Sequence, residues 1–406
     1  MNVLHINQSD ISGGASIAGF RLHEGLLAEG VDSRLLVGDM TLEDERVAAL
    51  PAPSFLDRQT SRVAWRMGLN YVNLTSSFAI RKHPFYKRAD ILNLHNLHGG
   101  YFNYLSVRSL TEIKPAVFTL HDMWSFTGHC AYSYDCGGWE RGCGQCPYLS
   151  TTPPVKRDST RLEWRLKNWV YNGSNLEIVA PSRWLAEQAR RSLLKRFPVH
   201  HIPYGLDLKI YRPLDADQSR RELGIPAGKK VLMFGAQMLS DQRKGGDLLL
   251  EALQGLPASL KSGIVLLTLG QGGEALAATT GMRTIHLGYL SGDAQKVRAY
   301  SAADLFIFPT RADNLPLMLQ ESMACGTPMV SFNIGGVPDM VRPGQTGYLA
   351  RDGDALDLRD GIMQLLEDER LLAEMGQRAR AIALDEYSLE LQASRYLEVY
   401  RRMLSK

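Results

Sequence analysis

No part of the 406-residue sequence approaches the roughly 18 consecutive apolar residues that a membrane-spanning helix needs. The sequence contains no low-complexity segment and no internal repeat, and its 45% hydrophobic and 22% charged residues exclude a mainly disordered chain. Its first residues have neither a positively charged leader nor an apolar secretion segment, so we expect a cytoplasmic protein. Because the net charge is only +3, the chain is not expected to bind nucleic acid.

The small excess of basic over acidic residues is unevenly distributed along the sequence. The first 205 residues hold 23 basic and 18 acidic residues, and the basic excess is concentrated between Phe55 and Ala89. A solvated helical face and a patch that binds phosphate or anionic headgroups both fit this segment, and the sequence alone does not decide between them. Its seven bases are Arg58, Arg62, Arg66, Arg81, Lys82, Lys87 and Arg88, interleaved with the aromatic residues Trp65, Tyr71, Phe78, Phe85 and Tyr86.

Short apolar runs alternate with helical patterns in two series, one on each side of residues 203–213. Representative apolar runs are residues 3–6 and 91–94 in the first series and residues 230–235 in the second. Such alternation is typical of a parallel sheet with both faces covered by helices. The sequence therefore predicts an α/β fold of two Rossmann-like parallel-sheet domains facing a cleft. The expected domains are residues 1–205, residues 206–385, and a final helix over residues 386–406 that packs back toward the first domain.

Two cations followed by two glycines come after the first strand of the second series. They are Arg243, Lys244, Gly245 and Gly246, and a helix is expected directly after them. Two positive charges, a close backbone approach and the amides of a helix start together suit a diphosphate group. A surface turn would show the same residues, and this motif alone does not exclude it.

A helix expected over residues 315–324 carries a carboxylate on an otherwise apolar surface. Pro316 fits its first turn, with Asp313 or Asn314 at its cap. Glu321 lies about one turn inside the helix, where a buried carboxylate is costly unless it accepts hydrogen bonds. The two hydroxyls of a ribose would provide them, as they do for acidic residues in dinucleotide-binding folds. A salt bridge with a neighbouring arginine is the structural alternative.

Taken together, these motifs resemble a known family, the retaining glycosyltransferases of family four (GT4), which have the two-domain GT-B fold and use nucleotide-sugar donors without a catalytic metal. The resemblance extends over most of the chain. The family's hallmark is a pair of glutamates with seven residues between them, and here Glu321 fills the second place and Asp313 the first. The other matching motifs are Gly13-Gly14, His121-Asp122, Ala180-Pro181-Ser182, Ile202-Pro203-Tyr204-Gly205-Leu206-Asp207, Arg243-Lys244-Gly245 and Gly335-Gly336-Val337-Pro338-Asp339.

The resemblance implies a role for each matching position. Lys244 and Arg243 would hold the diphosphate and stabilise it as a leaving group, and Glu321 would bind the ribose. Asp313 would contact hydroxyls of the donor sugar, and His121 would lie beside the reacting carbon. The implied catalytic residues are thus His121, Asp313 and Lys244. The implied donor-binding residues are Gly14, Arg243, Lys244, Leu290, Asn314, Leu315, Pro316, Leu317 and Glu321, with Leu290 meeting the base through its backbone.

Three positions depart from the family's pattern. Asp313 is one methylene shorter than the usual glutamate, and Ala236 stands where many relatives carry an arginine, for which Arg243 beside Lys244 would compensate. Tyr204 stands where asparagine is usual, in a linker whose expected role is geometric. The departures at Asp313 and Ala236 motivate one alternative, a catalytically inactive sugar-nucleotide-binding or scaffold subunit. A nucleotide-sugar epimerase of the same fold is a second alternative, against which the acidic pair argues.

Four of the five cysteines lie close together, with the spacing C-x5-C-x6-C-x2-C. Without an export signal reduced thiols are expected, which favours metal ligation over disulfides. A closed site of four thiolates would be structural zinc, in a loop that begins just after the His121 motif and so would shape the acceptor side. Four free thiols are the alternative, because only one C-x2-C pair is present. The four residues are Cys130, Cys136, Cys143 and Cys146.

The resemblance as a whole implies a metal-independent enzyme that moves a sugar from a UDP- or GDP-sugar to a glycan or a polyprenyl-linked acceptor, with retention of configuration. The second domain would hold the donor and the first the acceptor. Bacterial surface or exopolysaccharide biosynthesis is the expected setting. Since the first domain carries the basic and aromatic segment 55–89, we expect peripheral contact with the anionic inner face of the membrane.

Overall fold

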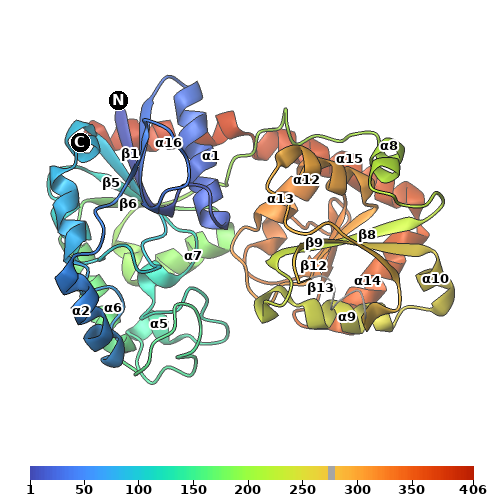
Figure 1. Cartoon of the computed structure of the whole chain (residues 1–406), viewed down its shortest axis with the longest axis horizontal. Coiled ribbons are helices and arrows are strands. Elements are labelled where there is room, and N and C mark those ends of the chain that lie inside the picture. Colours follow the sequence, from blue (N-terminus) through green and yellow to red (C-terminus); the bar gives the residue numbers. More distant parts are fainter. Residues whose placement is uncertain (273–278) are drawn as a thin grey trace. The chain divides into compact units, whose positions relative to one another are not determined.

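The computed structural model describes residues 1–272 and 279–406. The chain divides into two compact units (Figure 1). The first consists of Met1–Gly205 together with Leu389–Lys406, and the second of Leu206–Ser388. Each unit has its own sheet and its own buried core, so each is a domain in its own right.

The first unit is built on a parallel sheet. Its described strands form a seven-stranded sheet in the order β3-β2-β1-β4-β5-β6-β7. Every pairing between these strands is parallel. The strands are β1 (Asn2–Ser9), β2 (Asp32–Asp39), β3 (Val47–Ala49), β4 (Ile91–Leu94), β5 (Ala116–Thr119), β6 (Leu176–Ala180) and β7 (Val199–His201).

Helices and short 3-10 turns connect these strands. The first helix begins after Gly13, whose φ of +85° suits glycine. The helix after β6 is capped by Ser182, whose hydroxyl accepts a hydrogen bond from the Leu185 amide. The helices and turns are α1 (Gly14–Ala28), α2 (Phe55–Arg66), η1 (Thr75–Lys82), α3 (Pro84–Arg88), α4 (Ser106–Thr111), η2 (Trp124–Phe126), α5 (Gly138–Arg141), α6 (Thr160–Asn172), α7 (Arg183–Arg191), η3 (Leu193–Arg196) and α16 (Leu389–Leu404).

Neighbouring residues of a strand pack on opposite faces of the first sheet. Val3, Ile91 and Val117 lie in one buried cluster together with residues of α1 and α16. Leu4 and Leu92, each one residue further along its strand, lie in the larger cluster on the other face. Because both faces are covered, apolar residues stand at consecutive positions in these strands, as at residues 91–92 and 116–118.

The helix α16 returns to the first unit and lies beside α1 (Figure 1). Gly25 permits this close approach, because a Cβ at that position would lie 3.1 Å from Leu389 Cγ. Asn93 Nδ2, in β4, donates a hydrogen bond of 2.7 Å to Tyr400 Oη. The helix is thus bonded to the sheet as well as packed on it.

The second unit is built on another parallel sheet. Its described strands form a six-stranded sheet in the order β10-β9-β8-β11-β12-β13, and every pairing is parallel. The strands are β8 (Lys230–Met238), β9 (Ile264–Gln271), β10 (Arg283–His286), β11 (Leu305–Phe308), β12 (Met329–Phe332) and β13 (Gly347–Ala350). The helices and turns are α8 (Ala216–Glu222), η4 (Gln242–Lys244), α9 (Gly246–Gln254), α10 (Ala258–Ser262), α12 (Asp293–Ala302), α13 (Leu317–Ala324), η5 (Val337–Asp339), α14 (Ala355–Glu367) and α15 (Glu369–Glu386).

Each sheet has a switch point, at which the order of the strands reverses. It lies between β1 and β4 in the first sheet and between β8 and β11 in the second. Ligands of open α/β sheets bind beyond the carboxyl ends of the strands at such a point. The residues that follow β1, β4, β8 and β11 are therefore the candidates for a ligand-binding site. The predicted fold class, with a Rossmann-like parallel sheet in each domain, is confirmed.

Candidate functional site

Lys244 lies beyond the carboxyl end of β8, in the loop that leads to α9. The turn η4 carries Arg243 and Lys244, and Gly245 joins this turn to the helix with a φ of +69°. A Cβ at position 245 would lie 1.8 Å from the carbonyl oxygen of Pro309, which directly follows β11. Glycine at this position therefore lets the loop that carries the two cations rest against the end of β11.

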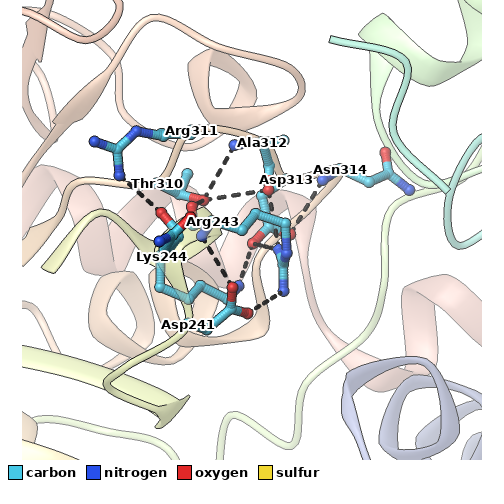
Figure 2. Close-up of polar contacts among 9 residues, drawn as sticks. Asp241, Arg243, Lys244, Thr310, Arg311, Ala312, Asp313 and Asn314 are labelled. Carbon is cyan, nitrogen blue, oxygen red and sulfur yellow. Dashed lines mark hydrogen bonds and ion pairs between the residues drawn. The ribbon is translucent and has the colours of Figure 1, made fainter. Parts of the chain in front are cut away.

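Arg243 and Lys244 converge on one carboxylate, that of Asp313 (Figure 2). Lys244 Nζ lies 2.5 Å from Asp313 Oδ2, and Arg243 Nη1 lies 3.3 Å from the same oxygen. Arg243 also donates a hydrogen bond of 3.0 Å to the Ala312 carbonyl oxygen and lies 3.4 Å from a carboxylate oxygen of Asp241. Three residues predicted for the site, from the loops after β8 and β11, are thus neighbours at the switch point of the second sheet.

Burial and charge act in opposite directions on this group of residues. Burial lowers the pKa of Lys244, and the charge of Asp313 opposes that effect while the charge of Arg243 adds to it. Burial alone would raise the pKa of Asp313, but the charges of Lys244 and Arg243 outweigh it and hold this pKa below its ordinary value. Asp313 is therefore ionised at neutral pH. A diphosphate, which carries more negative charge than one carboxylate, would compete for the same two cations.

The Asp313 backbone is held by the two glycines of the motif Gly335-Gly336-Val337-Pro338-Asp339. Gly335 has a φ of +54°, and a Cβ at that position would lie 2.1 Å from the Asp313 carbonyl oxygen. The Gly336 amide donates a hydrogen bond of 3.2 Å to the same oxygen. These glycines therefore set the backbone position from which Asp313 reaches Lys244.

The helix α13 begins later than the sequence predicted. Pro316 was expected inside the first turn, with Asp313 or Asn314 as the cap, but Pro316 is itself the N-cap, with extended backbone. The reason is that the Pro316 carbonyl oxygen accepts the first helical hydrogen bond, from the Leu319 amide at 3.1 Å. The amides of Leu319 and Gln320 donate to the Pro316 carbonyl oxygen, whereas those of Leu317 and Met318 precede the first bonded turn and have no carbonyl of this helix to bond to. The predicted donor-binding residues Asn314, Leu315, Pro316 and Leu317 all lie at this helix start.

Glu321 lies inside α13 with 5% of its surface exposed. Its Oε2 accepts a hydrogen bond of 3.3 Å from the hydroxyl of Tyr300, in α12. Leu290, predicted to meet the base, follows β10 and is partly exposed. The Gly288 carbonyl, two residues earlier, accepts a hydrogen bond of 2.8 Å from the Gly270 amide. The predicted ribose and base contacts therefore both lie on segments that are tied to neighbouring elements.

In the first unit, His121 follows β5 and is linked to two other side chains. Its Nδ1 lies 2.7 Å from Tyr204 Oη, and its Nε2 lies 3.0 Å from His95 Nδ1. Burial lowers the pKa of His121 to about 4, although the charge of Asp122 opposes it, so the ring is neutral at pH 7. Gly14, the other site residue predicted in this unit, is the first residue of α1 and lies beyond the end of β1.

The clustered cysteines do not form the metal site that their spacing predicted. Within residues 1–272 and 279–406, no group of three or more histidine, cysteine, aspartate or glutamate side chains is arranged to hold a metal ion. The sulfurs contact their own loop instead: the Gly128 amide lies 3.2 Å from Cys143 Sγ, and His129 Nε2 lies 3.4 Å from Cys146 Sγ. Burial raises the pKa of Cys130 to about 12 and that of Cys143 to about 11, so both are thiols. The zinc prediction is therefore corrected to free thiols at Cys130, Cys136, Cys143 and Cys146.

The basic and aromatic segment 55–89 is exposed only in part. Phe55, Leu56 and Trp65, all in α2, are 74%, 69% and 52% exposed. Tyr86 is buried, and its hydroxyl donates a hydrogen bond to a backbone carbonyl. The exposed apolar surface is thus concentrated on α2. In the part of the chain that the structure describes, no helix has the length and apolar character needed to cross a membrane.

Three side chains at these sites were missed by the sequence reasoning. Asp241 contacts Arg243, Tyr300 contacts Glu321, and His95 contacts His121. His95 follows β4 in the way that His121 follows β5, and this repetition of a strand followed by histidine is the signal that could have found it. The sequence offers no comparable signal for Asp241 or Tyr300.

Two family models match consecutive parts of the chain. Residues 12–210 match the family model described as Glycosyltransferase Family 4, and residues 215–382 match the model described as Glycosyl transferases group 1. With the two parallel sheets, these matches define a glycosyltransferase of the GT-B fold. The chain belongs to the family-four (GT4) glycosyltransferases. The epimerase alternative is therefore not retained.

Individual relatives agree with this assignment. The chain is 25% identical to WcaC of Escherichia coli K12, described as a colanic acid biosynthesis glycosyl transferase, over 99% of this chain and 100% of the relative. The solved sucrose-phosphate synthase from Thermosynechococcus elongatus matches with a TM-score of 0.73 and 18% identity, over 100% of both chains. HepE from Anabaena, solved in complex with UDP, matches with a TM-score of 0.67 and 17% identity, over 99% of this chain and 100% of that one. At these identities the two structures show the fold.

Proposed function

We propose that the protein moves a sugar from a nucleoside-diphosphate sugar to a glycan or a lipid-linked acceptor, with retention of configuration and without a catalytic metal, in the assembly of a surface polysaccharide. The observation that carries this proposal is the convergence of Lys244, Arg243 and Asp313 at the switch point of the second sheet. The UDP bound to HepE supports a UDP- or GDP-sugar as the donor. The description of WcaC supports a glycan acceptor. In this proposal the second domain holds the donor and the first the acceptor.

In the proposed reaction, the bond between the sugar C1 and the diphosphate oxygen breaks, and a bond between C1 and the acceptor oxygen forms on the same face. The proton of the acceptor hydroxyl passes to the departing diphosphate, so no separate base is required. Lys244 and Arg243 stabilise the charge that develops on the diphosphate, which is work that a metal ion does in other enzymes. Catalysis then depends mainly on holding donor and acceptor in position.

Asp313 has two tasks in this proposal. Before the donor binds, it neutralises Lys244 and Arg243 at distances of 2.5 and 3.3 Å. When the diphosphate takes over these cations, the carboxylate becomes available to accept hydrogen bonds from hydroxyls of the donor sugar. The missing methylene, compared with the usual glutamate, is consistent with a carboxylate that lies directly on the two cations.

Donor binding tests the proposal. We expect UDP or GDP and one of their sugar conjugates to raise the midpoint of thermal unfolding in the presence of a chelator, because a ligand of the folded state stabilises it. In Glu321→Gln the affinity for that donor should fall about 10- to 100-fold, the range for a lost hydrogen bond to a charged group. Glu367→Gln, at an exposed glutamate of α14, should leave the affinity unchanged.

Four outcomes would contradict this assignment. If no nucleotide or nucleotide sugar shifts the midpoint, the donor site is absent. If Glu321→Gln binds the donor as tightly as the native protein, Glu321 does not bind the ribose. Release of free nucleoside diphosphate that requires added magnesium or manganese would remove the proposal of metal independence, and no release at all would favour an inactive binding subunit.

We further propose that α2 attaches the protein to the anionic inner face of the membrane. The exposed Phe55, Leu56 and Trp65 provide apolar groups that can insert at the depth of the headgroups. The same helix carries three exposed arginines, and each base near an anionic surface adds about 1 kcal/mol. These arginines are Arg58, Arg62 and Arg66.

Co-sedimentation with vesicles tests this attachment. We expect the protein to bind anionic vesicles at low salt, to bind much less at high salt, and not to bind neutral vesicles. The double variant Leu56→Ser/Trp65→Ser should bind at least about tenfold more weakly, since it removes two inserting groups. The control is Ile113→Ser/Leu384→Ser, which removes apolar groups that are 65% and 53% exposed elsewhere. Equal loss in both variants, or binding that is absent at low salt, would refute the role of α2.

A further inference from the structure

Three histidines and a tyrosine form an unbroken hydrogen-bonded chain in the first unit, which we call the histidine relay. His5 Nδ1 lies 2.9 Å from His95 Nε2, and His95 Nδ1 lies 3.0 Å from His121 Nε2. His121 Nδ1 in turn lies 2.7 Å from Tyr204 Oη. Successive rings are stacked, with centroids 5.2, 5.3 and 5.5 Å apart. The relay therefore links the interior of the sheet to His121, which the resemblance to family four places beside the reacting carbon.

The order of the strands brings the relay together. His5 lies in β1, His95 directly follows β4, and His121 follows the neighbouring β5. His5 is 0% exposed and His95 is 1% exposed. The helix α1 closes over them at Gly19, where a Cβ would lie 3.4 Å from His95 Cε1. The two inner rings are thus shielded from water, and their hydrogen bonds are made within the relay.

The relay histidines are neutral at pH 7. Burial lowers the pKa of all three from the ordinary value, that of His121 to about 4. The charged or titratable groups that face the relay are His23 beside His5, and Asp122 and His98 beside His121. A neutral imidazole has one N–H and one lone pair. The hydrogens of the relay must therefore point all toward Tyr204 or all toward His5.

The inner end of the relay selects between these two directions. His5 Nε2 is buried and has no hydrogen-bond partner among the described residues. If the hydrogens point toward His5, Nε2 carries a hydrogen that has no acceptor. If they point toward Tyr204, Nε2 carries no hydrogen and its lone pair accepts no hydrogen bond. Buried N–H groups without a partner are rarer than acceptors without one. The favoured direction is toward Tyr204, with each hydrogen on Nδ1, the nitrogen that free neutral histidine protonates less often.

We propose that His5, His95 and Tyr204 are positioning residues that hold His121 as a neutral ring with its hydrogen on Nδ1, bonded to Tyr204. This rests on the proposed function in one respect, the place of His121 beside the reacting carbon. Because both ring nitrogens of His121 are bonded within the relay, the ring acts as a fixed neutral group and not as a base. Tyr204 thereby gains a side-chain role at the position where asparagine is usual in the family.

Nitrogen-15 NMR of the histidine rings tests this inference, with signals assigned from single replacements among the 10 histidines. At pH 7 we expect a hydrogen-bearing Nδ1 and a bare Nε2 in His5, His95 and His121. In Tyr204→Phe the hydroxyl that accepts the hydrogen of His121 Nδ1 is lost, so the direction toward Tyr204 is no longer favoured over the direction toward His5. We therefore expect mixed tautomers in all three rings, including His5, which is two rings away from the substitution.

Tyr86→Phe is the matched control, because it removes a buried hydroxyl of the same unit that bonds to the Leu110 carbonyl, outside the relay.

In Tyr204→Phe we expect kcat to fall about tenfold or more, the range for groups that orient an active-site residue, with unchanged donor affinity. A hydrogen on Nε2 of His121 in the native protein, or an unchanged His5 in Tyr204→Phe, would overturn the relay. A native protein that neither binds nor cleaves a donor would overturn the proposed function, and the tautomers would still be measured.

Discussion

Replacing Lys244 by alanine is expected to lower kcat by about two orders of magnitude, which corresponds to roughly 3 kcal/mol of lost leaving-group stabilisation. Lys244 is one of the two cations that contact Asp313 at the switch point of the second sheet, and the other, Arg243, carries only part of the charge that the diphosphate needs. The fold should persist, because Arg243 still pairs with Asp313 after the substitution. Steady-state kinetics and the midpoint of thermal unfolding measure the two effects separately.

Lys230→Ala is the control for this substitution. Lys230 Nζ also lies 2.5 Å from a carboxylate oxygen, that of Glu369, but on the surface of the same unit. Its loss should leave kcat unchanged and alter stability by at most about 1 kcal/mol. Near-normal turnover in a folded Lys244→Ala protein would remove the leaving-group role, whereas loss of the fold would make Lys244 a structural residue.

Replacing Gly245 by alanine is expected to destabilise the second unit by about 3 kcal/mol or more, because it combines strain at φ of +69° with a collision against a backbone oxygen. The added Cβ would lie 1.8 Å from the Pro309 carbonyl oxygen, so one of the two backbone segments must shift. For a domain of this size the midpoint of thermal unfolding should fall by about 10 °C. Calorimetry measures this change.

Gly228→Ala separates the collision from the strain. Gly228 has a nearly identical φ of +71°, but nothing lies within 4 Å of an added Cβ. This control should cost only about 1 kcal/mol, the value for strain alone. Equal effects at the two positions would show that the contact of the loop with Pro309 is unimportant for stability.

Strands that appear in the sequence as continuous apolar runs were predictable. The apolar run 91–94 is β4 with the same bounds, and the apolar run 230–235 lies within β8. The strands β3, β7 and β13 were not expected. Each lies at an edge of its sheet and has few β-branched residues, so it depends on the one neighbour with which it pairs. The start of α13 was misplaced because sequence alone does not show which carbonyl begins the helical hydrogen bonds.

The site residues around Lys244 could be predicted from the sequence, whereas the histidine relay could not. The difference is whether neighbours in space are also recognisable from local sequence motifs. Lys244 lies in a motif whose local chemistry suits a diphosphate, and Asp313 was identified by the resemblance to the acidic pair of the family. His5 and His95 are 90 positions apart, and only the pairing of β1 with β4 makes them neighbours. The cysteine prediction failed because a spacing limits which sulfurs can meet but does not place them around a common point.

The return of α16 to the first unit has a consequence for biosynthesis. When residues 1–205 have left the ribosome, α16 has not been made, and Val3, Ile91 and Val117 lack the helix that covers them. The contiguous second unit emerges next, which takes on the order of 10–40 s at bacterial or slower translation rates. The second unit can therefore complete its folding before the first unit does, although it is synthesised later. During that interval the uncovered side of the first sheet is an apolar surface that a chaperone can shield until α16 arrives.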